Sequence, residues 1–226
     1  MELIFIRHGQ PAWSVDGWSQ TDPHLTELGL RQAQLAADRL AVDRRPGELI
    51  VSPATRAQET ASPIAGTTGL DITTIDDLLE IQFPDWSGEL EETVVRIFDE
   101  GKHRSPEEWW DGMPGGESFR SFHERVTTAM EKLLADHGVT PDPERRHLWN
   151  VAEPGQRLAI VAHGGTNAVA LTYLLDVDPA PWEWERFILY HASFARVRAI
   201  EIAGAHAFSL RTFNDREHLP QDLRSR

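Results

Sequence analysis

The amino-acid sequence predicts an α/β fold with a largely parallel sheet, because short apolar runs alternate with helical segments along the chain. Residues 3–6 and 158–162 are short runs rich in branched and aromatic side chains, as is typical of buried strands. Apolar residues spaced by threes and fours between positions 119 and 134 indicate an amphipathic helix. Each of the two apolar runs leads into a His–Gly pair, so we expect both pairs at the same edge of the sheet, where they can face one ligand.

Strand and helix signals follow one another through the first half of the chain. Thr26 is a suitable helix cap, Ser52-Pro53 ends a strand, and Thr55-Arg56-Ala57-Gln58 has the form of a capping box. We therefore expect, in order, a polar loop at 10–25, a helix at 26–41, a strand at 48–51 after a Pro-Gly turn, a helix from 55 to about 66, and a weaker strand at 71–75.

The second half of the chain begins with an irregular stretch. Residues 84–116 contain several Pro and Gly breakers around a short helix, and we expect them to form an insertion or lid within a single domain of residues 1–226. Gly138 ends the amphipathic helix. The expected elements are a helix at about 90–98, the helix at 119–134, a polar loop at 140–155, the strand at 158–162, a helix at 166–175, and strands at 195–202 and 207–213.

Composition excludes several classes of function. Acidic residues outnumber basic ones 36 to 22, giving a formal charge of −14, so nucleic acid and anionic membranes are poor partners. The chain has no long uncharged apolar run and no cysteine, which favours a cytoplasmic protein without a signal peptide, membrane span or thiolate metal site. An anionic substrate would therefore need a local cluster of arginines.

His8, between Arg7 and Gly9, is the first candidate for chemistry. A neutral imidazole can attack a phosphoryl group and carry it as phosphohistidine. Arg7 supplies paired donors for phosphoryl oxygens, and Gly9 allows the backbone to approach a ligand. The alternative is an ordinary structural histidine at a strand end.

Arg56 and His163 are candidates for holding the same anion. Arg56 lies in the first turn of a predicted helix, where a cation is unfavourable unless an anion binds there. His163, if protonated, would support negative charge on a transferring group, and Gly164 begins a turn whose backbone N–H groups can bind anions. The alternatives are a surface arginine paired with Glu59 or another acid, and a structural histidine in a turn.

Glu80 is the candidate proton donor. A phosphoryl leaving group needs a proton, and a carboxyl group near the phosphate can supply it. Glu80 has apolar neighbours on both sides, while Asp76 and Asp77 are the other acids available in this segment.

These residues occur within motifs that resemble the histidine phosphatase superfamily, in its phosphoglycerate-mutase-like branch. The resemblance extends from residue 3 to residue 219, and its motifs come in the expected order. The matching segments are 3–9 with Arg-His-Gly, 25–29 with Gln32-Ala33, 52–60, Leu79-Glu80 with Trp86-Ser87-Gly88, 115–118, 161–164, and 213–215 with His218-Leu219.

The resemblance implies a three-layer αβα sandwich and a role for each candidate. His8 would be the phosphorylated nucleophile, and Glu80 would protonate the leaving group and then activate water. Arg7, Arg56 and His163 would form the phosphate pocket without a metal or organic cofactor. The family often has glutamate after the glycine and asparagine six positions after the nucleophile, where this chain has Gln10 and Ser14. Ser14 and Gly164 are further candidates for phosphate contacts.

The function expected from these observations is a phosphatase acting on small-molecule phosphomonoesters. A cofactor-dependent phosphoglycerate mutase is the alternative, and it would need extra cations over the pocket. The insertion offers Arg96, Lys102, His103 and Arg104 among many acids, and it is short for such a mutase.

Two further functions use the same residues differently. A metallohydrolase would use both histidines as ligands, but no HExxH spacing is present and Arg7 beside His8 disfavours a cation. A non-catalytic phosphate-binding regulatory module is the other alternative. The tryptophans are interpreted as packing residues, with Trp13, Trp18 and Trp109-Trp110 as candidates for an apolar entrance and Trp182 and Trp184 for sheet cover or a homo-oligomer surface.

Overall fold

The computed structural model describes residues 1–225, in which eight strands form one sheet. The strand order is β5-β4-β8-β1-β9-β10-β7-β6. The first four are parallel to one another, and each later strand is antiparallel to its neighbour. The strands span Ile72–Thr74 (β5), Glu48–Val51 (β4), Arg157–Ala162 (β8), Glu2–Arg7 (β1), Phe194–Ile202 (β9), Ala205–Asp215 (β10), Trp149–Val151 (β7) and Val139–Pro141 (β6).

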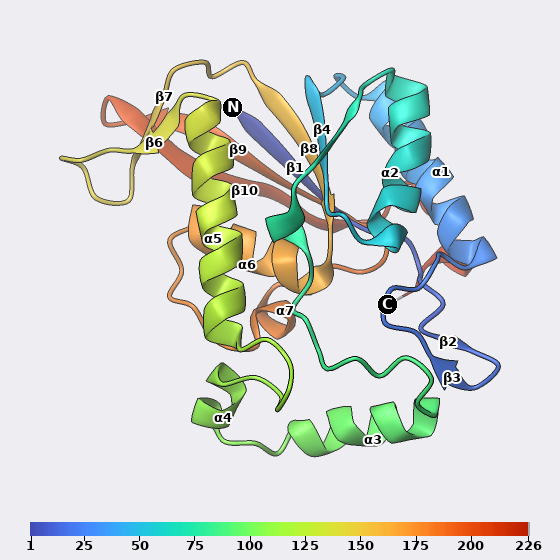
Figure 1. Cartoon of the computed structure of the whole chain (residues 1–226). Helices are drawn as coiled ribbons and strands as arrows, with labels where there is room; N and C mark the ends of the chain where they lie inside the picture. Colours follow the sequence, from blue (N-terminus) through green and yellow to red (C-terminus); the bar gives the residue numbers. More distant parts are fainter. Residues whose placement is uncertain (226) are drawn as a thin grey trace.

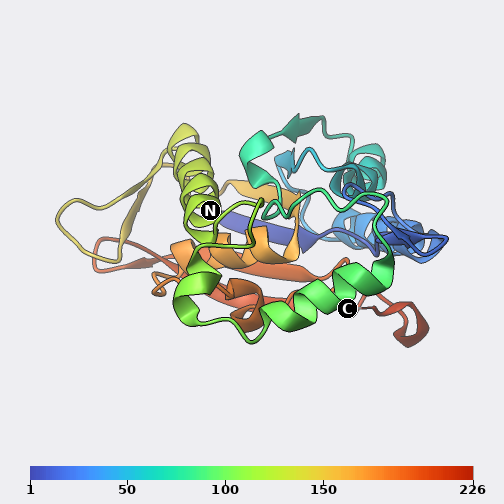
Figure 2. The ribbon, with the colours of Figure 1, turned by 60° about the horizontal axis from the view of Figure 1, so that its bottom comes forward.

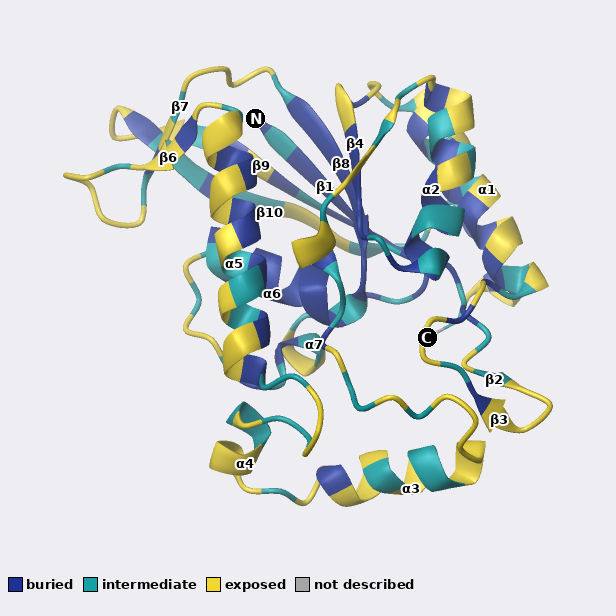
Figure 3. Cartoon of the chain, in the orientation of Figure 1, coloured by how far each residue is buried: buried dark blue, intermediate teal, exposed yellow. Residues whose placement is uncertain are grey.

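Helices cover both faces of this sheet, so the predicted three-layer α/β architecture is confirmed (Figure 1). Side chains of β1 alternate between two cores, because successive residues of a strand point to opposite faces. Leu3 and Phe5 join the core beneath α5 (Phe119–Asp136) and α6 (Gly164–Leu174). Ile4 and Ile6 join the core beneath α1 (Glu27–Val42) and α2 (Thr55–Thr68). Figure 3 shows the strands between these layers as the most deeply buried part of the chain.

Local sequence explains where the long helices begin and end. Thr26 caps α1, because its side chain accepts a hydrogen bond from the backbone N–H of Gly29. Ser118 caps α5 in the same way by accepting from Ser121. The apolar positions spaced by threes and fours in α5 are buried, as the periodicity predicts.

Two of the predicted loops contain short β-strands, so these two predictions are wrong in part. Residues 140–155 overlap β6 and include β7, which together extend the antiparallel side of the sheet. The loop at 10–25 contains a short hairpin, β2 (Ser14–Val15) and β3 (Trp18–Ser19). Strands of two or three residues are too short to produce a hydrophobic alternation that a sequence reading could detect.

Residues 84–116 lie beyond the carboxyl ends of the parallel strands and contain α3 (Glu91–Gly101) and α4 (Pro106–Trp110) (Figures 1 and 2). The expected short helix is therefore present, and α4 was not predicted. Backbone hydrogen bonds join this segment to the β2–β3 hairpin, from Ser19 N–H to the Glu89 carbonyl at 2.9 Å and from Glu91 N–H to the Gly17 carbonyl at 3.0 Å. The short elements η1 (Asp76–Leu78), α7 (Glu183–Arg186) and η2 (Gln221–Leu223) complete the chain. Among residues 1–225, no helix has the length and apolarity needed to cross a bilayer.

Candidate active site

The two predicted histidines meet at one edge of the sheet. Strands β1 and β8 are parallel neighbours, with Arg7 opposite Ala162, so His8 and His163 leave the sheet side by side. Their ring centroids are 5.2 Å apart, and both residues are buried. Ser52, which follows the neighbouring strand β4, donates to or accepts from Nε2 of His163 at 2.7 Å.

Hydrogen bonds fix the orientation and the tautomer of the His8 ring. Its Nδ1 lies 2.8 Å from the carbonyl oxygen of Gly9, which can only accept, so Nδ1 carries the proton. Nε2 therefore carries no proton, and its lone pair accepts a hydrogen bond from Nε of Arg56 at 3.3 Å. Burial, reinforced by His163, Arg56 and Arg7, lowers the pKa of His8 well below 6.5. The imidazole is therefore neutral at neutral pH, as attack on phosphorus requires.

Gly9 is needed for a different reason from the one that the sequence suggested. A Cβ atom at this position would lie 2.5 Å from the carbonyl oxygen of Gly29 in α1. A ligand contact was the expected reason for the glycine, but a close approach between two backbone segments requires it here. Gly9 thus lets α1 pack directly against the turn that follows His8.

Arg56 is buried near His8, and Arg7 is partly buried there. Arg7 donates through Nη1 to the carbonyl oxygen of Leu189 at 2.6 Å, and its buried Nε has no protein partner among residues 1–225. Arg56 lies in the first turn of α2, as predicted, and is only 5% exposed. Burial lowers the pKa of both arginines, while the negative charge of Glu80 counteracts this effect. Glu80 is therefore close enough to both guanidinium groups to influence their charge.

Asp22 binds the N-terminus of α2, which carries a partial positive charge. The sequence alone did not point to this acid. Asp22 accepts from the backbone N–H of Thr55 at 3.0 Å and from Nη1 of Arg56 at 3.3 Å. The expected capping box at Thr55 is wrong, because Ala54 is the N-cap and Asp22 supplies the acceptor from outside the helix. Glu59 was the expected partner of a surface arginine, but it binds His24 instead. An anion was expected at this helix start, and the chain provides one itself.

His163 keeps one ring nitrogen without a protein partner. Its Nε2 bonds to Ser52, whereas its buried Nδ1 has no hydrogen-bond partner among residues 1–225. Burial and the two arginines lower the pKa of His163 well below 6.5, so the ring is neutral in this environment. The protonated role predicted for it would require the negative charge of a bound phosphate. Gly164 packs against Arg7, since a Cβ there would lie 3.6 Å from the Arg7 Nε.

Glu80 is held at the start of α6. Its carboxylate accepts from the backbone N–H groups of Gly165 at 2.8 Å and Thr166 at 3.1 Å. The helix start that was expected to bind phosphate through its N–H groups thus binds this carboxylate. Asp76 and Asp77, the other candidate acids, are exposed on η1.

Ser14 is not brought into this cluster. It lies in the β2–β3 hairpin, and its hydroxyl donates to Glu91 of the 84–116 segment at 2.8 Å. Trp13, its neighbour, instead faces Arg56, with the guanidinium carbon 4.8 Å from the ring centroid. The hairpin therefore reaches the site through Trp13.

Comparison with known proteins identifies the family. Residues 3–140, more than half of the chain, match the model of the histidine phosphatase superfamily (branch 1). The chain belongs to the histidine phosphatase superfamily. The antiparallel strands β9 and β10 lie outside the matched residues, and the nucleophile candidate His8 lies inside them.

Relatives in the histidine phosphatase superfamily include named enzymes. Phosphoserine phosphatase 1 of Hydrogenobacter thermophilus is 32% identical over 181 residues, which cover 79% of this chain and 78% of that protein. Phosphoglycerate mutase-like protein 4 of Arabidopsis thaliana is 30% identical over 169 residues, but the chain spans only 66% of its length. A solved structure of mycobacterial glucosyl-3-phosphoglycerate phosphatase has a TM-score of 0.69 at 26% identity, covering 94% of this chain and 98% of that one.

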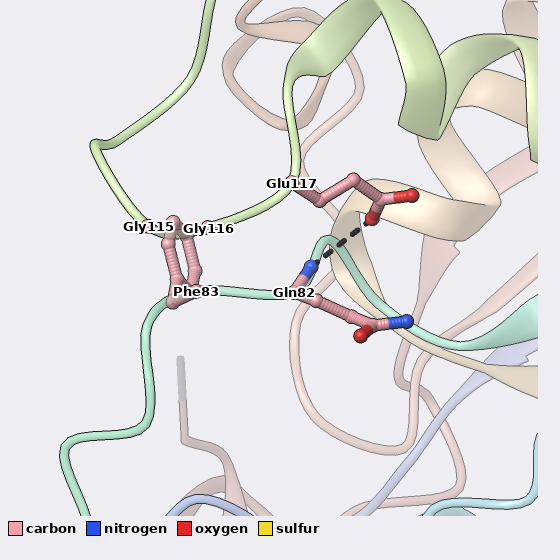
Figure 4. A pocket seen from close by; sticks show the side chains of 5 residues that line it. All are labelled: Gln82, Phe83, Gly115, Gly116 and Glu117. Carbon is pink, nitrogen blue, oxygen red and sulfur yellow. Dashed lines mark hydrogen bonds between the residues drawn. The ribbon is translucent and has the colours of Figure 1, made fainter.

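Arg125 and Glu117 anchor the segment around Glu80 in this histidine phosphatase. The sequence alone indicates no role for either residue. Arg125 of α5 donates to the carbonyl oxygens of Asp77 at 2.8 Å and Leu79 at 3.1 Å, and it forms an ion pair with Glu117 at 2.7 Å. Glu117 also accepts from the backbone N–H of Gln82 at 3.1 Å, beside a hollow of about 240 Å³ (Figure 4). The Gly-Gly-Glu-Ser motif at 115–118 was the only sequence signal of this anchor.

A third unpredicted residue, His191, lies in the turn before β9. Its ring centroid is 5.8 Å from that of His8, and its Nε2 is 3.3 Å from Nη2 of Arg7. No motif in the sequence pointed to it. Within residues 1–225, His, Asp and Glu side chains form no group of three or more that could hold a metal ion.

Proposed function

We propose that this member of the histidine phosphatase superfamily hydrolyses small-molecule phosphomonoesters through a phosphohistidine at His8. The observation that carries the proposal is the state of His8, which is neutral and fixed by Gly9, with an unprotonated Nε2 that accepts from the buried Arg56 and with the partly buried Arg7 beside it in the chain. In a chain with a formal charge of −14, one buried and one partly buried arginine beside an unprotonated imidazole nitrogen form a local site for an anion.

The proposed reaction has two steps. Nε2 of His8 attacks phosphorus, the bond from phosphorus to the alcohol oxygen breaks, and the protonated carboxyl group of Glu80 gives its proton to that oxygen. The Glu80 carboxylate then takes a proton from water, the water oxygen attacks phosphorus, and the P–N bond breaks to release phosphate and neutral His8. Arg7 and Arg56 would stabilise the transferring oxygens throughout.

Two unpaired buried nitrogens support phosphate binding at this place. Nε of Arg7 and Nδ1 of His163 have no hydrogen-bond partner within residues 1–225, although buried polar groups are nearly always paired. Phosphoryl oxygens would satisfy both nitrogens. The cationic groups would also supply the charge stabilisation that a metal provides elsewhere, so we propose a reaction that needs no metal or organic cofactor.

The charges of the lid favour a phosphatase over a phosphoglycerate mutase. A mutase would need free cations for a carboxylate and a second phosphate. Across residues 84–116, acidic residues outnumber Lys and Arg by nine to three. Arg96 lies 4.0 Å from Glu100, Lys102 bonds to Asp99 at 2.7 Å, and Arg104 donates to the carbonyl oxygen of Glu108. The lid cations are therefore engaged by the lid itself.

The wider setting follows from the same features. We propose that residues 1–226 form one domain with a lid at 84–116, and that the enzyme acts in the cytoplasm on a small phosphate ester. The absence of cysteine and the strong negative charge favour that location and disfavour nucleic acid and anionic membranes as partners. The phosphatase names of relatives with similar chains also support a small phosphate ester as the substrate.

The test is to trap the covalent intermediate. Rapid acid-free quenching of the enzyme with ³²P-labelled phosphoester should leave acid-labile phosphate on His8. His8→Ala should abolish turnover of p-nitrophenyl phosphate, whereas His206→Ala, near the opposite end of the sheet, should retain it. Wild-type-like activity in His8→Ala would refute the mechanism. Phosphate binding without any turnover or labelling would instead support the regulatory module.

A further inference from the structure

His191 lies against the phosphate-binding arginine and is not explained by the reaction steps above. The residue is 4% exposed and sits in the turn that enters β9. The pairing of β9 with β1 places this turn beside His8. Arg7 has two protein anchors that its hydrogen bonds define, the carbonyl oxygen of Leu189 and the His191 ring. His191 thus provides one of the two contacts that orient the guanidinium.

The partners of His191 determine its tautomer. A guanidinium group only donates, so Nε2 of His191 must accept from Arg7 and cannot carry a proton. The proton must then reside on Nδ1, which lies 2.9 Å from the hydroxyl oxygen of Ser225. Burial, with a smaller effect from Arg7, lowers the pKa of His191 to about 3, so the neutral ring persists at all ordinary pH values.

Ser225 is itself fixed by a buried glutamine. Oε1 of Gln32 accepts from the backbone N–H of Gln10 at 2.8 Å, which assigns the other amide atom as a donor. That Nε2 donates to Ser225 at 2.9 Å and to the carbonyl oxygen of Leu223 at 2.7 Å. Hydrogen bonds therefore run without a break from Arg7 through His191 and Ser225 to Gln32 in α1.

We propose that His191 and Ser225 are positioning residues, in which Ser225 holds His191 as the Nδ1–H tautomer and His191 thereby aims the Arg7 guanidinium at the phosphate. The inference rests on the proposed function for the role of Arg7 as a phosphate ligand. Neither residue touches the reacting atoms. Their effect should therefore appear in the binding of phosphate more than in the rate of the chemical step.

Binding of inorganic phosphate, measured by calorimetry on the full chain, tests this directly. His191→Phe keeps a planar ring but removes the acceptor, so the Kd for phosphate should rise about tenfold, as expected for losing a hydrogen bond to a charged group. His191→Gln should stay within about threefold of the wild type, because its amide can accept from Arg7 and donate to Ser225. The matched control His206→Phe, near the other end of the sheet, should bind phosphate normally.

Kinetics and spectroscopy provide readouts that a purely structural role would not move. With p-nitrophenyl phosphate, His191→Phe should raise KM about tenfold while kcat stays within about threefold. The ¹⁵N chemical shifts of the wild-type ring should show Nδ1 protonated and Nε2 bare. Ser225→Ala should weaken phosphate binding about threefold, because Nδ1–H of His191 then lacks its partner, while Arg7 still keeps Nε2 bare.

Several outcomes would overturn the inference. These are a protonated Nε2 in the wild type, a folded His191→Phe that binds phosphate normally, or a His191→Gln as impaired as His191→Phe. If His191→Phe does not fold, the wild-type ring shifts and Ser225→Ala decide the matter. If the wild type binds phosphate but hydrolyses no ester, the proposed function fails, while the binding series still tests the positioning.

Discussion

Replacing Gly165 by alanine should displace Glu80 without removing or adding any charged group. An ideal Cβ at this position would lie 2.4 Å from Oε1 of Glu80, whereas ordinary contacts begin at 3.4 Å. The carboxylate would therefore have to retreat by about 1 Å from the N–H groups of Gly165 and Thr166 that now hold it. Alanine is otherwise favourable in a helix, so the change should act on the site more than on the fold.

The expected loss follows from the size of this displacement. A misplacement of about 1 Å at a reacting group can cost about 10²-fold in rate, which corresponds to about 2.7 kcal/mol. With an alkyl phosphate, whose leaving group needs a proton, kcat should fall about 100-fold. With p-nitrophenyl phosphate the leaving group needs no proton, so the first step should stay fast and the second, which needs Glu80 as a base, should become slow. Stopped-flow absorbance should then show a burst of about one p-nitrophenol per enzyme.

A matched glycine in α2 provides the control. Gly66→Ala would meet no atom within 4 Å, so it should leave kcat unchanged and raise stability by about 0.5–1 kcal/mol. If Gly165→Ala folds with a normal Tm and keeps kcat within threefold of the wild type for alkyl phosphates, the role assigned to Glu80 is incorrect.

The other predictions concern the anchor of Glu80, pH and metals. Arg125→Gln should lower kcat about tenfold with little change in KM, because it releases the carbonyl oxygens that fix the Glu80 segment. Wild-type activity in Arg125→Lys, whose ammonium group cannot make the same forked contacts, would argue against this bidentate anchoring. Burial lowers the pKa of His191 to about 3 and that of His218 to about 4, from an ordinary value of 6.5. Between these values and pH 6.5 the unfolded chain therefore binds more protons than the folded one. The free energy of unfolding should fall as the pH drops through this range, by about 1.4 kcal/mol per pH unit for each ring. Urea unfolding at pH 7 and pH 5 measures this, and equal stabilities would contradict it. EDTA should not change the activity, whereas strong inhibition would point to the metallohydrolase mechanism.

The sequence allowed the central pair of the site to be predicted because local signals sufficed. His8 and His163 each follow a short apolar run, and the ends of neighbouring parallel strands meet at one edge. Arg56 was predicted from its unfavourable position at a helix start. Its partner Asp22 lies in an irregular loop 34 residues earlier in the chain. Nothing in that loop's periodicity indicates which helix it will reach.

The supporting residues depend on tertiary pairing and so escaped prediction. His191 is brought to His8 only by the antiparallel pairing of β9 with β1, and Ser225 only by the contacts of the segment after β10. Arg125 reaches the Glu80 segment from the middle of α5, where an arginine reads as an ordinary surface residue. These residues act by orienting other side chains, and a residue with that role has no characteristic spacing in the sequence.

The hydrogen bonds between the β2–β3 hairpin and the lid have a consequence for engineering. The backbone of Ser19 donates a hydrogen bond to the carbonyl oxygen of Glu89 and accepts one from the N–H of Gly88 at 3.1 Å. The hydrogen bond from Ser14 to Glu91 adds a third contact between the hairpin and residues 84–116. A chimaera that exchanged only residues 84–116 with a relative would leave unmatched donors and acceptors along the hairpin. The unit to transplant is discontinuous in sequence, comprising residues 14–22 together with 84–116. A change of substrate preference by recombination would therefore need two coordinated segment exchanges.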